Sequence, residues 1–202
     1  NNGFAGGNNI WAYAATGEYI LFLNNDTVVT PDFLGRLVTT CKKDMKIGCI
    51  QPEMRVMAHQ NVLDEAGAYL TMSGFLYHYG YRKVHRLPMY RSPRVIFSAK
   101  GACMLIPKNA FDHVGGFDND FFIFFEETDL CHRLWLAGYK VLYQPDSYIY
   151  HVAGGDTMNT YNYERRIFLT FKNMNCSYLK NFGTLYLATI YPVFICFQIG
   201  VL

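Results

Sequence analysis

Short apolar runs and helix-like spacing alternate along the first part of the chain. Residues 19–23 (YILFL) form an apolar run rich in strand-forming side chains, and residues 47–51 form a second one. Between them, residues 30–32 (TPD) are typical of a helix start and predict a helix to about Lys43. A strand, a helix and a strand at this spacing form a β-α-β unit. We therefore expect a parallel sheet whose ligands lie at the carboxyl ends of its strands.

The same pattern continues in the second half of the chain. Residues 102–106 predict a buried strand that leads into a short helix, and residues 127–137 have the apolar spacing of a longer helix. Residues 139–143 and 148–152 predict two further strands. Residues 54–98 mix aromatic side chains with glycine, so we expect an excursion of short strands and loops there rather than a separate domain.

The C-terminal stretch is unusually apolar. Residues 182–202 contain no Asp, Glu, Lys or Arg, and about twenty apolar residues are enough to cross a bilayer as a helix. Basic residues precede the stretch, namely Arg165, Arg166 and Lys172. Such flanks favour the cytoplasmic side, so we expect a membrane-associated protein whose main domain faces the cytoplasm. The alternatives are a helix buried in the core and an interfacial helix kinked at Pro192.

Composition and charge limit the possible organisation and partners. The chain has 202 residues, 51% of them hydrophobic, which is enough to bury one main core. We assign this core to residues 1–160 and treat residues 161–202 as a helical, membrane-associating segment. A formal net charge of +2, with scattered basic residues, argues against a nucleic-acid partner. The start, NNGFAGGNN, has neither an initiator Met nor a leader pattern, so we expect an upstream part of the domain to be missing.

Polar residues follow the first predicted strand directly. Asn24, Asn25 and Asp26 come at its end, where an open α/β sheet places its site. A carboxylate with neighbouring amides can hold a hard divalent cation that also binds phosphate oxygens. The same three residues are also a common turn sequence.

Two more polar clusters lie further along. Glu126, Glu127 and Asp129 follow the apolar residues 121–125. Acidic residues at a helix start stabilise the helix dipole, but burial against apolar neighbours also raises a carboxylate pKa and makes it a usable general base. His151 follows a predicted strand and is either structural or a metal ligand.

In this order and spacing, the clusters resemble the family 2 glycosyltransferases, in particular the rhamnosyltransferase-like branch that builds bacterial polysaccharides. The matching stretches are residues 3–9 (GFAGGNN), 17–34, 101–141 and 149–151. The resemblance implies the GT-A type of α/β fold, a mixed, mostly parallel sheet flanked by helices, to which we add a C-terminal apolar helix. It also implies an inverting, metal-dependent transfer of a sugar from a nucleoside diphosphate sugar to an acceptor hydroxyl. The acceptor is a saccharide or a lipid-linked compound in cell-surface polysaccharide or glycolipid synthesis.

The resemblance also assigns roles to individual residues. Asp26 and His151 match positions that bind a divalent metal, Mg²⁺ or Mn²⁺. Glu127 matches the general base, where the family usually has Asp. This difference, with the missing upstream part, leaves open an inactive or binding-only relative that keeps the fold and the metal site. The expected substrate and nucleotide contacts are Asn9, Asn24, Asn25, Gly101, Glu126 and Asp129.

Overall fold

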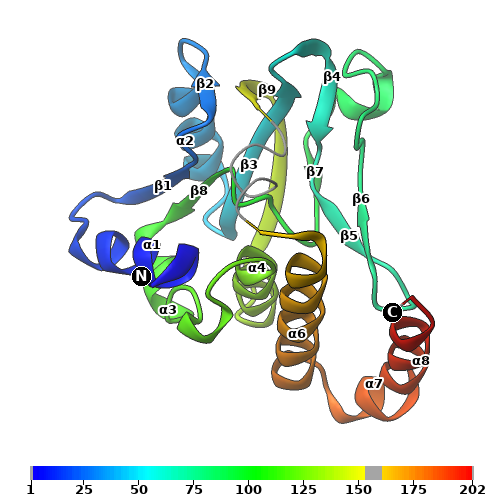
Figure 1. Ribbon diagram of the computed structural model, residues 1–202. Coiled ribbons are helices and arrows are strands. Elements are labelled where there is room, and N and C mark those ends of the chain that lie inside the picture. The colour runs from blue at the N-terminus through cyan, green and yellow to red at the C-terminus, as the bar shows by residue number, and fades with distance from the viewer. Residues whose placement is uncertain (1, 153–160, 202) are drawn as a thin grey trace.

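A mixed sheet forms the centre of the chain (Figure 1). The structure is a computed structural model that describes residues 2–152 and 161–201, and within these ranges the sheet has seven strands. They lie in the order β1-β8-β3-β9-β2, with β4 paired to β3 and β7 paired to β9. The strands are β1 (Tyr19–Leu23), β2 (Thr27–Val29), β3 (Ile47–Val56), β4 (His59–Glu65), β7 (Arg94–Val95), β8 (Cys103–Pro107) and β9 (Lys140–His151).

The strand directions agree only partly with the predicted parallel sheet. β3 and β9 are parallel, whereas the other pairings of the described strands are antiparallel. β1 and β3 run in the same direction, but β8 lies between them and is antiparallel to both. The sheet is thus mixed, as predicted, with fewer parallel pairings than expected. The reason is that the strand after the excursion inserts into the β-α-β unit, and the local pattern of residues cannot indicate such a long-range pairing.

Helices cover both faces of the sheet. The helices α2, α3 and α4 confirm the helical patterns of the sequence, while α1 was not predicted because its glycines disfavour a helix. The two strands predicted over residues 139–143 and 148–152 form the single strand β9, which has a register shift opposite β3. The helices near the sheet are α1 (Gly3–Ala14), α2 (Phe33–Lys43), α3 (Lys108–His113) and α4 (Glu126–Leu136).

The excursion over residues 54–98 consists of short elements, as predicted. Besides β4 and β7 it contains the two-stranded hairpin of β5 (Ala68–Leu70) and β6 (Leu76–His78). It also contains the short 3-10 helix η1 (Pro88–Tyr90). A second such helix, η2 (Asn119–Phe121), lies in the loop before α4.

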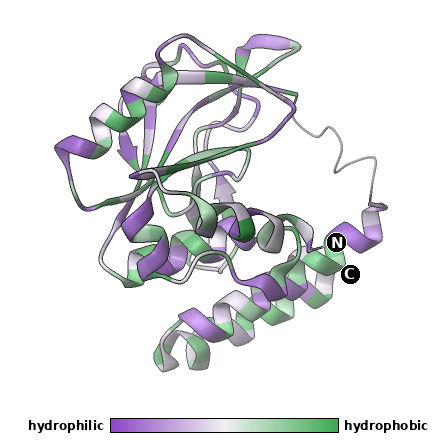
Figure 2. Cartoon of the chain, turned by 90° about the vertical axis from the view of Figure 1, so that its left-hand side faces the viewer, coloured by the Kyte–Doolittle hydropathy of each residue, from purple (hydrophilic) through white to green (hydrophobic). Residues whose placement is uncertain are grey.

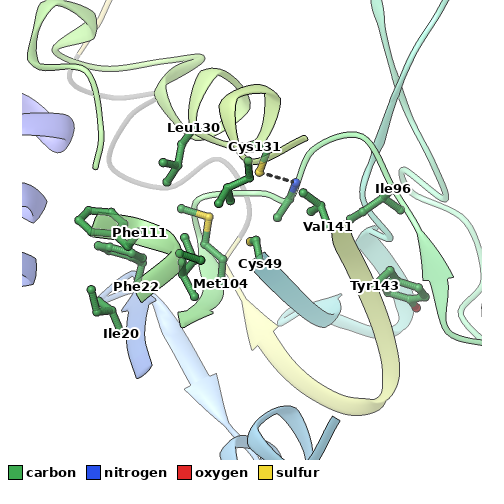
Figure 3. Close-up of a cluster of buried hydrophobic side chains, with 14 of the residues drawn as sticks. Ile20, Phe22, Cys49, Ile96, Met104, Phe111, Leu130, Cys131, Val141 and Tyr143 are labelled. Atoms are coloured by element: carbon green, nitrogen blue, oxygen red, sulfur yellow. Dashed lines mark hydrogen bonds between the residues drawn. The ribbon is translucent and has the colours of Figure 1, made fainter. Parts of the chain in front are cut away.

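The sheet is buried on both faces because successive strand residues enter different hydrophobic clusters. On one face, Ile20 and Phe22 of β1 pack with Phe111 of α3 and Leu130 of α4 (Figure 3). The rings of Phe22 and Phe111 lie 5.5 Å apart. With both faces covered, the sheet can present a polar site only at the ends of its strands. The cluster on the opposite face joins strand residues to α2 and includes Phe33, Leu37, Cys41, Ile50 and Leu105.

The apolar C-terminal stretch forms short helices and not one long helix. After α6 (Tyr163–Asn181) come α7 (Thr184–Thr189) and α8 (Tyr191–Val201). Within the described residues, the search for a helix both long and apolar enough to cross a membrane finds none. The single membrane-spanning helix expected over residues 182–202 is thus not found in the described part of this stretch. Two breaks divide the stretch: Gly183 precedes α7, and Pro192, which has no backbone N–H to donate, lies at the start of α8.

Part of α8 packs on the rest of the chain. Phe194 is fully buried, and its ring lies 5.2 Å from the ring of Tyr178 in α6 and 4.9 Å from that of Phe75, next to β6. Figure 1 shows α8 beside the tip of the β5–β6 hairpin. Hydrophobic residues run along this end of the chain (Figure 2), and some of them, such as Phe197, remain exposed.

We expect Phe194→Ala to release α8 from α6 and the hairpin. Removing a buried aromatic side chain costs about 3 to 5 kcal/mol, which is more than a short helix gains from its own hydrogen bonds. Hydrogen exchange of the amides in residues 191–200 should therefore become faster. Phe197→Ala is the matched control, because that ring is 56% exposed and should leave exchange unchanged. Equal exchange in the two variants would contradict the packing described here.

Candidate active site

The end of β9 lies beside the turn that follows β1. β2 begins after this turn and pairs with β9, with Thr27 opposite His151. This register brings Asp26 next to His151, so that Asp26 Oδ1 and His151 Nε2 are 3.4 Å apart. Two residues that are far apart in the sequence therefore meet at one edge of the sheet, as the predicted metal site requires.

The buried carboxylate of Asp64 holds the other side of the His151 ring. Asp64 Oδ2 lies 2.8 Å from His151 Nδ1 and 2.7 Å from Lys100 Nζ. Burial opposes ionisation of Asp64, but the contacts with His151 and Lys100 outweigh it and lower its pKa to about 2. An ionised carboxylate can only accept hydrogen bonds, so Nδ1 of His151 must be the donor. The Nε2 atom on the other side of the ring faces Asp26, and whenever Nε2 carries no proton its lone pair points toward that carboxylate.

This geometry fits a bound cation. In the neutral ring, Nε2 of His151 and Oδ1 of Asp26 are two acceptors facing each other, and Asp26 Oδ1 is buried without a hydrogen-bond partner. A cation between them, or a proton on Nε2, would satisfy both atoms. The described residues contain no group of three or more His, Cys, Asp and Glu side chains that could hold a metal. A metal held by Asp26 and His151 would thus need further oxygen ligands from water and substrate phosphates, as Mg²⁺ commonly does.

A pocket lies next to Lys100, the residue that also contacts Asp64. Its volume is about 350 Å³, and Glu127 at the start of α4 forms part of its wall. Lys100 also lines this pocket while its Nζ contacts Asp64, so a continuous chain of contacts runs from Asp26 through His151, Asp64 and Lys100 to the pocket. Other lining residues come from β4, the β5–β6 hairpin and the segment before β8, and include Glu65, His78, Tyr81 and Ser98.

Glu126, which is buried, and Glu127, which is partly buried, both have carboxyl groups with raised pKa values. Burial raises the pKa of Glu127, and hydrogen bonds from its own backbone N–H and that of Gly101 oppose the shift only in part. Burial also raises the pKa of Glu126 well above its ordinary value, and the neighbouring charge of Glu127 adds to the effect. The Oε2 atoms of both residues are buried without a hydrogen-bond partner. Of the two, Glu127 lines the pocket, where a raised proton affinity suits a general base.

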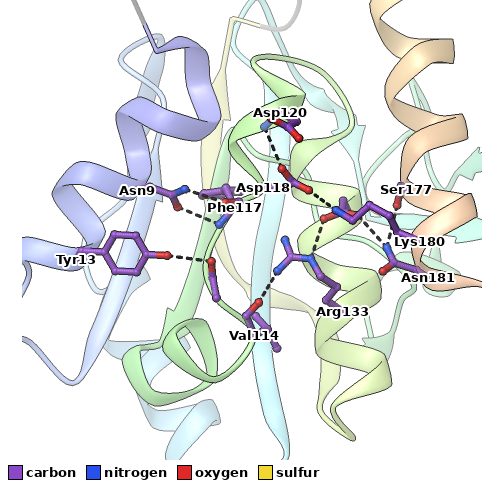
Figure 4. A network of polar contacts seen from close by, with 12 residues as sticks. Asn9, Tyr13, Val114, Phe117, Asp118, Asp120, Arg133, Ser177, Lys180 and Asn181 are labelled. Carbon is purple, nitrogen blue, oxygen red and sulfur yellow. Dashed lines mark hydrogen bonds and ion pairs between the residues drawn. The ribbon is translucent and has the colours of Figure 1, made fainter.

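Two residues predicted to contact substrate are already bonded within the protein. The Asn9 amide donates to the carbonyl of Phe117 at 2.7 Å and accepts from its N–H at 2.9 Å (Figure 4). Asp129 accepts from Arg133 and from Asn181 of α6, both at 2.8 Å. These contacts hold the loop before α4 and join α4 to α6, so both side chains stabilise the elements around the site, and their contacts with substrate stay predictions.

The remaining predicted contacts lie at the edge of the site. Asn24 donates its backbone N–H to Ala102, and Asn25 is exposed in the turn, so the turn interpretation of these residues is also correct. Gly101 is buried against Glu127, and a Cβ atom there would lie 3.7 Å from the Cβ of Glu127. Their roles in binding stay predictions.

Sequence reasoning did not identify Asp64 or Lys100. Asp64 is the penultimate residue of β4, and Lys100 lies three residues before β8 begins. A charged residue beside a buried strand was the available signal, but only the pairing of the strands shows that the two side chains meet.

A larger pocket of about 590 Å³ lies at the opposite end of β1, where its charged lining residues Glu18 and Lys42 are exposed.

The chain belongs to a family of glycosyltransferases. The family model described as "Glycosyltransferase like family 2" matches residues 2–175, which is most of the chain. This confirms the resemblance inferred from the motifs.

Two curated bacterial proteins illustrate the relationship. The O-antigen biosynthesis protein RfbC of Myxococcus xanthus is 28% identical over 161 residues, covering 71% of this chain and 12% of its own length. The rhamnosyltransferase WbbL of Escherichia coli K12 is 28% identical over 155 residues, covering 73% of this chain and 57% of its own length. The chain thus spans only part of the length of these relatives.

A solved structure supports the fold. The crystal structure of GalNAc-T7 with UDP, GalNAc and Mn²⁺ superposes with a TM-score of 0.65 at 18% identity, covering 88% of this chain and 34% of the other. At this identity the similarity shows the fold alone, which is the GT-A type of mixed α/β fold.

We expect Glu126→Gln to increase the free energy of unfolding relative to the parent, and we expect this gain to be larger at neutral pH than at acid pH. Because the folded protein raises the Glu126 pKa above its ordinary 4.5, the native state binds more protons than the unfolded chain above that pH. The parent therefore loses stability as pH rises through this range, by up to about 1.4 kcal/mol per pH unit, and glutamine removes this loss. Urea unfolding at pH 5 and pH 8 measures the difference. A stability gain that does not grow with pH would contradict the assignment.

Proposed function

We propose that this chain is the catalytic part of an inverting glycosyltransferase that transfers a hexosyl or rhamnosyl group from a nucleoside diphosphate sugar to an acceptor hydroxyl. The product would belong to a cell-surface polysaccharide or glycolipid. The observation that carries the proposal is the chain of contacts from Asp26 and His151 through Asp64 and Lys100 to the pocket with Glu127. It would join two metal ligands, Asp26 and His151, to a partly buried base, Glu127.

The metal end of the site would hold the donor diphosphate. Asp26 Oδ1 and His151 Nε2 would supply two protein ligands to Mg²⁺ or Mn²⁺, and the contact with Asp64 keeps the His151 ring in the orientation required. A bound divalent cation supplies positive charge that offsets the negative charge building on the departing diphosphate. The similar proteins fit this proposal, since they include a rhamnosyltransferase and a complex with UDP and Mn²⁺.

The base end of the site would hold the acceptor. Glu127 would take the proton from the attacking hydroxyl, on the face of the sugar opposite the leaving diphosphate. A single displacement of this kind inverts the anomeric centre. The polar and aromatic lining of the pocket, including His78 and Tyr81, suits a saccharide or the sugar end of a lipid-linked acceptor.

An inactive relative that only binds the donor is the second candidate, and it is favoured by Glu127 in place of the family's usual Asp. A panel of UDP-, GDP- and dTDP-sugars, offered with Mn²⁺ and with free and lipid-linked saccharide acceptors, separates the two. Release of nucleoside diphosphate with a product of inverted anomeric configuration, read by proton NMR, supports the enzyme. Donor binding without release supports the binder.

We expect Asp26→Ala to abolish Mn²⁺-dependent binding of the donor while the protein stays folded. Asp26 lies in a turn at the end of β1, outside the hydrophobic clusters, so its loss removes a ligand without opening the core. His151→Ala should weaken the same binding less, because one ligand among several oxygens is lost. Calorimetric titration with Mn²⁺ alone, and then with Mn²⁺ and UDP, measures both effects. Asp146→Ala, at an exposed carboxylate, is the control, and Mn²⁺ binding by Asp26→Ala equal to that control would exclude the assignment.

We expect Glu127→Gln to lower turnover by about two to four powers of ten, the usual contribution of a positioned general base. Donor affinity should stay nearly constant, since the carboxylate acts on the acceptor. Glu127→Asp should retain activity, because Asp is the usual residue of the family. Steady-state release of nucleoside diphosphate and donor calorimetry measure the two quantities separately. If Glu126→Gln were inactive while Glu127→Gln turned over like the parent, the base would be Glu126.

A further inference from the structure

The loop before α4 has an uncommon backbone conformation. Phe122, Phe124 and Phe125 have φ values of 43°, 69° and 70°, a region that residues other than glycine seldom occupy. Three bulky aromatic residues within four positions hold this conformation immediately before Glu126 and Glu127. Such a backbone persists only where the surrounding structure imposes it.

Asn173 of α6 is the side chain best placed to impose this conformation. It is 1% exposed, and its Nδ2 lies 2.9 Å from the Phe121 carbonyl oxygen, 2.9 Å from that of Ile123 and 2.7 Å from that of Phe124. An amide has two hydrogens, so at least one is shared between two carbonyls. Each of the three carbonyls belongs to the residue directly before a residue of positive φ, so one buried side chain holds the peptide groups that lead into all three of them.

The opposite side of the loop is held by the start of α1. The backbone N–H groups of Phe4 and Ala5 donate to the Phe122 carbonyl, at 2.7 and 3.3 Å. The approach is so close that a Cβ atom on Gly3 would lie 2.2 Å from that oxygen, so only glycine fits there. The loop is therefore held between α1 and α6, two elements that lie outside the sheet.

We propose that Asn173 is a positioning residue for Glu127, holding the left-handed loop so that α4 starts where the Glu127 carboxylate faces the pocket. The proposal rests on the proposed function, because it gives Glu127 the role of base. Asn173 itself contacts backbone carbonyls, so its effect would pass through the loop. Phe125, the last residue of the loop, also packs its ring against Tyr178 of the same helix, at 5.8 Å.

The test compares Asn173→Ala with Asn175→Ala on the same helix. The Asn175 amide donates to the Phe171 carbonyl and to Gln198, away from the loop, which makes it a matched control. Hydrogen exchange of the amides in residues 121–127 should become at least tenfold faster in Asn173→Ala and stay at the parent rate in Asn175→Ala. Exchange in α2, on the opposite face of the sheet, should not change in either variant.

Turnover gives the second measurement. Release of nucleoside diphosphate from the best donor of the panel, with Mn²⁺, should show kcat reduced at least tenfold and donor KM changed less than twofold in Asn173→Ala. Each kcat is referred to the number of donor-binding sites found by calorimetry, so that unfolded molecules do not count. If Asn173→Ala does not fold, Asn173→Ser, which keeps one hydroxyl donor, gives the same comparison with a smaller change.

The outcomes separate the two proposals. Unchanged exchange in residues 121–127 overturns the role of Asn173 in holding the loop. Faster exchange with unchanged kcat per site overturns its role in positioning Glu127. A parent protein that releases no nucleoside diphosphate from any donor overturns the proposed function, and the exchange measurement then still decides whether Asn173 holds the loop.

Discussion

The parallel pairing of β3 with β9 determines where the parts of the candidate site lie. It extends from Ile47 opposite Lys140 to Val56 opposite His151, and so carries β9 to the edge of the sheet where β1 ends. β4 folds back on β3 and brings Asp64 behind the His151 ring. Because side chains alternate between the faces of a strand, a shift of one residue in this register would turn His151 away from its partners. The chemistry therefore depends on a long pairing whose own residues are mostly buried and apolar.

Burial raises the pKa of both Asp64 and Glu127, but their contacts differ, so the net pKa shifts are opposite. Asp64 is almost completely buried, yet its pKa is low because His151 and Lys100 both contact it. Glu127 is partly buried, and its pKa is raised because only weaker contacts stabilise its charge. One carboxylate is thus kept ionised to orient a ring, while the other keeps a high affinity for protons. This difference follows from which cation lies within hydrogen-bonding distance.

Sequence patterns predicted the elements whose formation depends on neighbouring residues. The apolar runs of β1 and β8 and the helical spacing of α4 reflect local periodicity, and the structure contains all three. The same patterns could not indicate that β8 inserts between β1 and β3, since strand order depends on contacts between distant residues. They also favoured one long apolar helix at the C-terminus, because the stretch is long and uncharged; of its two breaks, they indicated the one at Pro192 as an alternative and did not indicate the one at Gly183. Of the site, the motifs identified the strand ends and the start of α4, while Asp64 and Lys100 became evident only from strand pairing.

A motif does not distinguish side chains that bind a ligand from those that hold the site together, but hydrogen bonding does. Asn9 and Asp129 belong to the matching stretches, yet both are buried with their polar atoms bonded to other parts of the chain. Binding a substrate would break those bonds and leave polar groups unpaired, which costs free energy. Asp26 and Glu127, in contrast, each have a buried oxygen without a hydrogen-bond partner. A buried acceptor of this kind is tolerated where a ligand or a proton satisfies it, and Glu126 Oε2 is a third such atom, so hydrogen bonding leaves Asp26, Glu126 and Glu127 as the carboxylates available for the proposed chemistry.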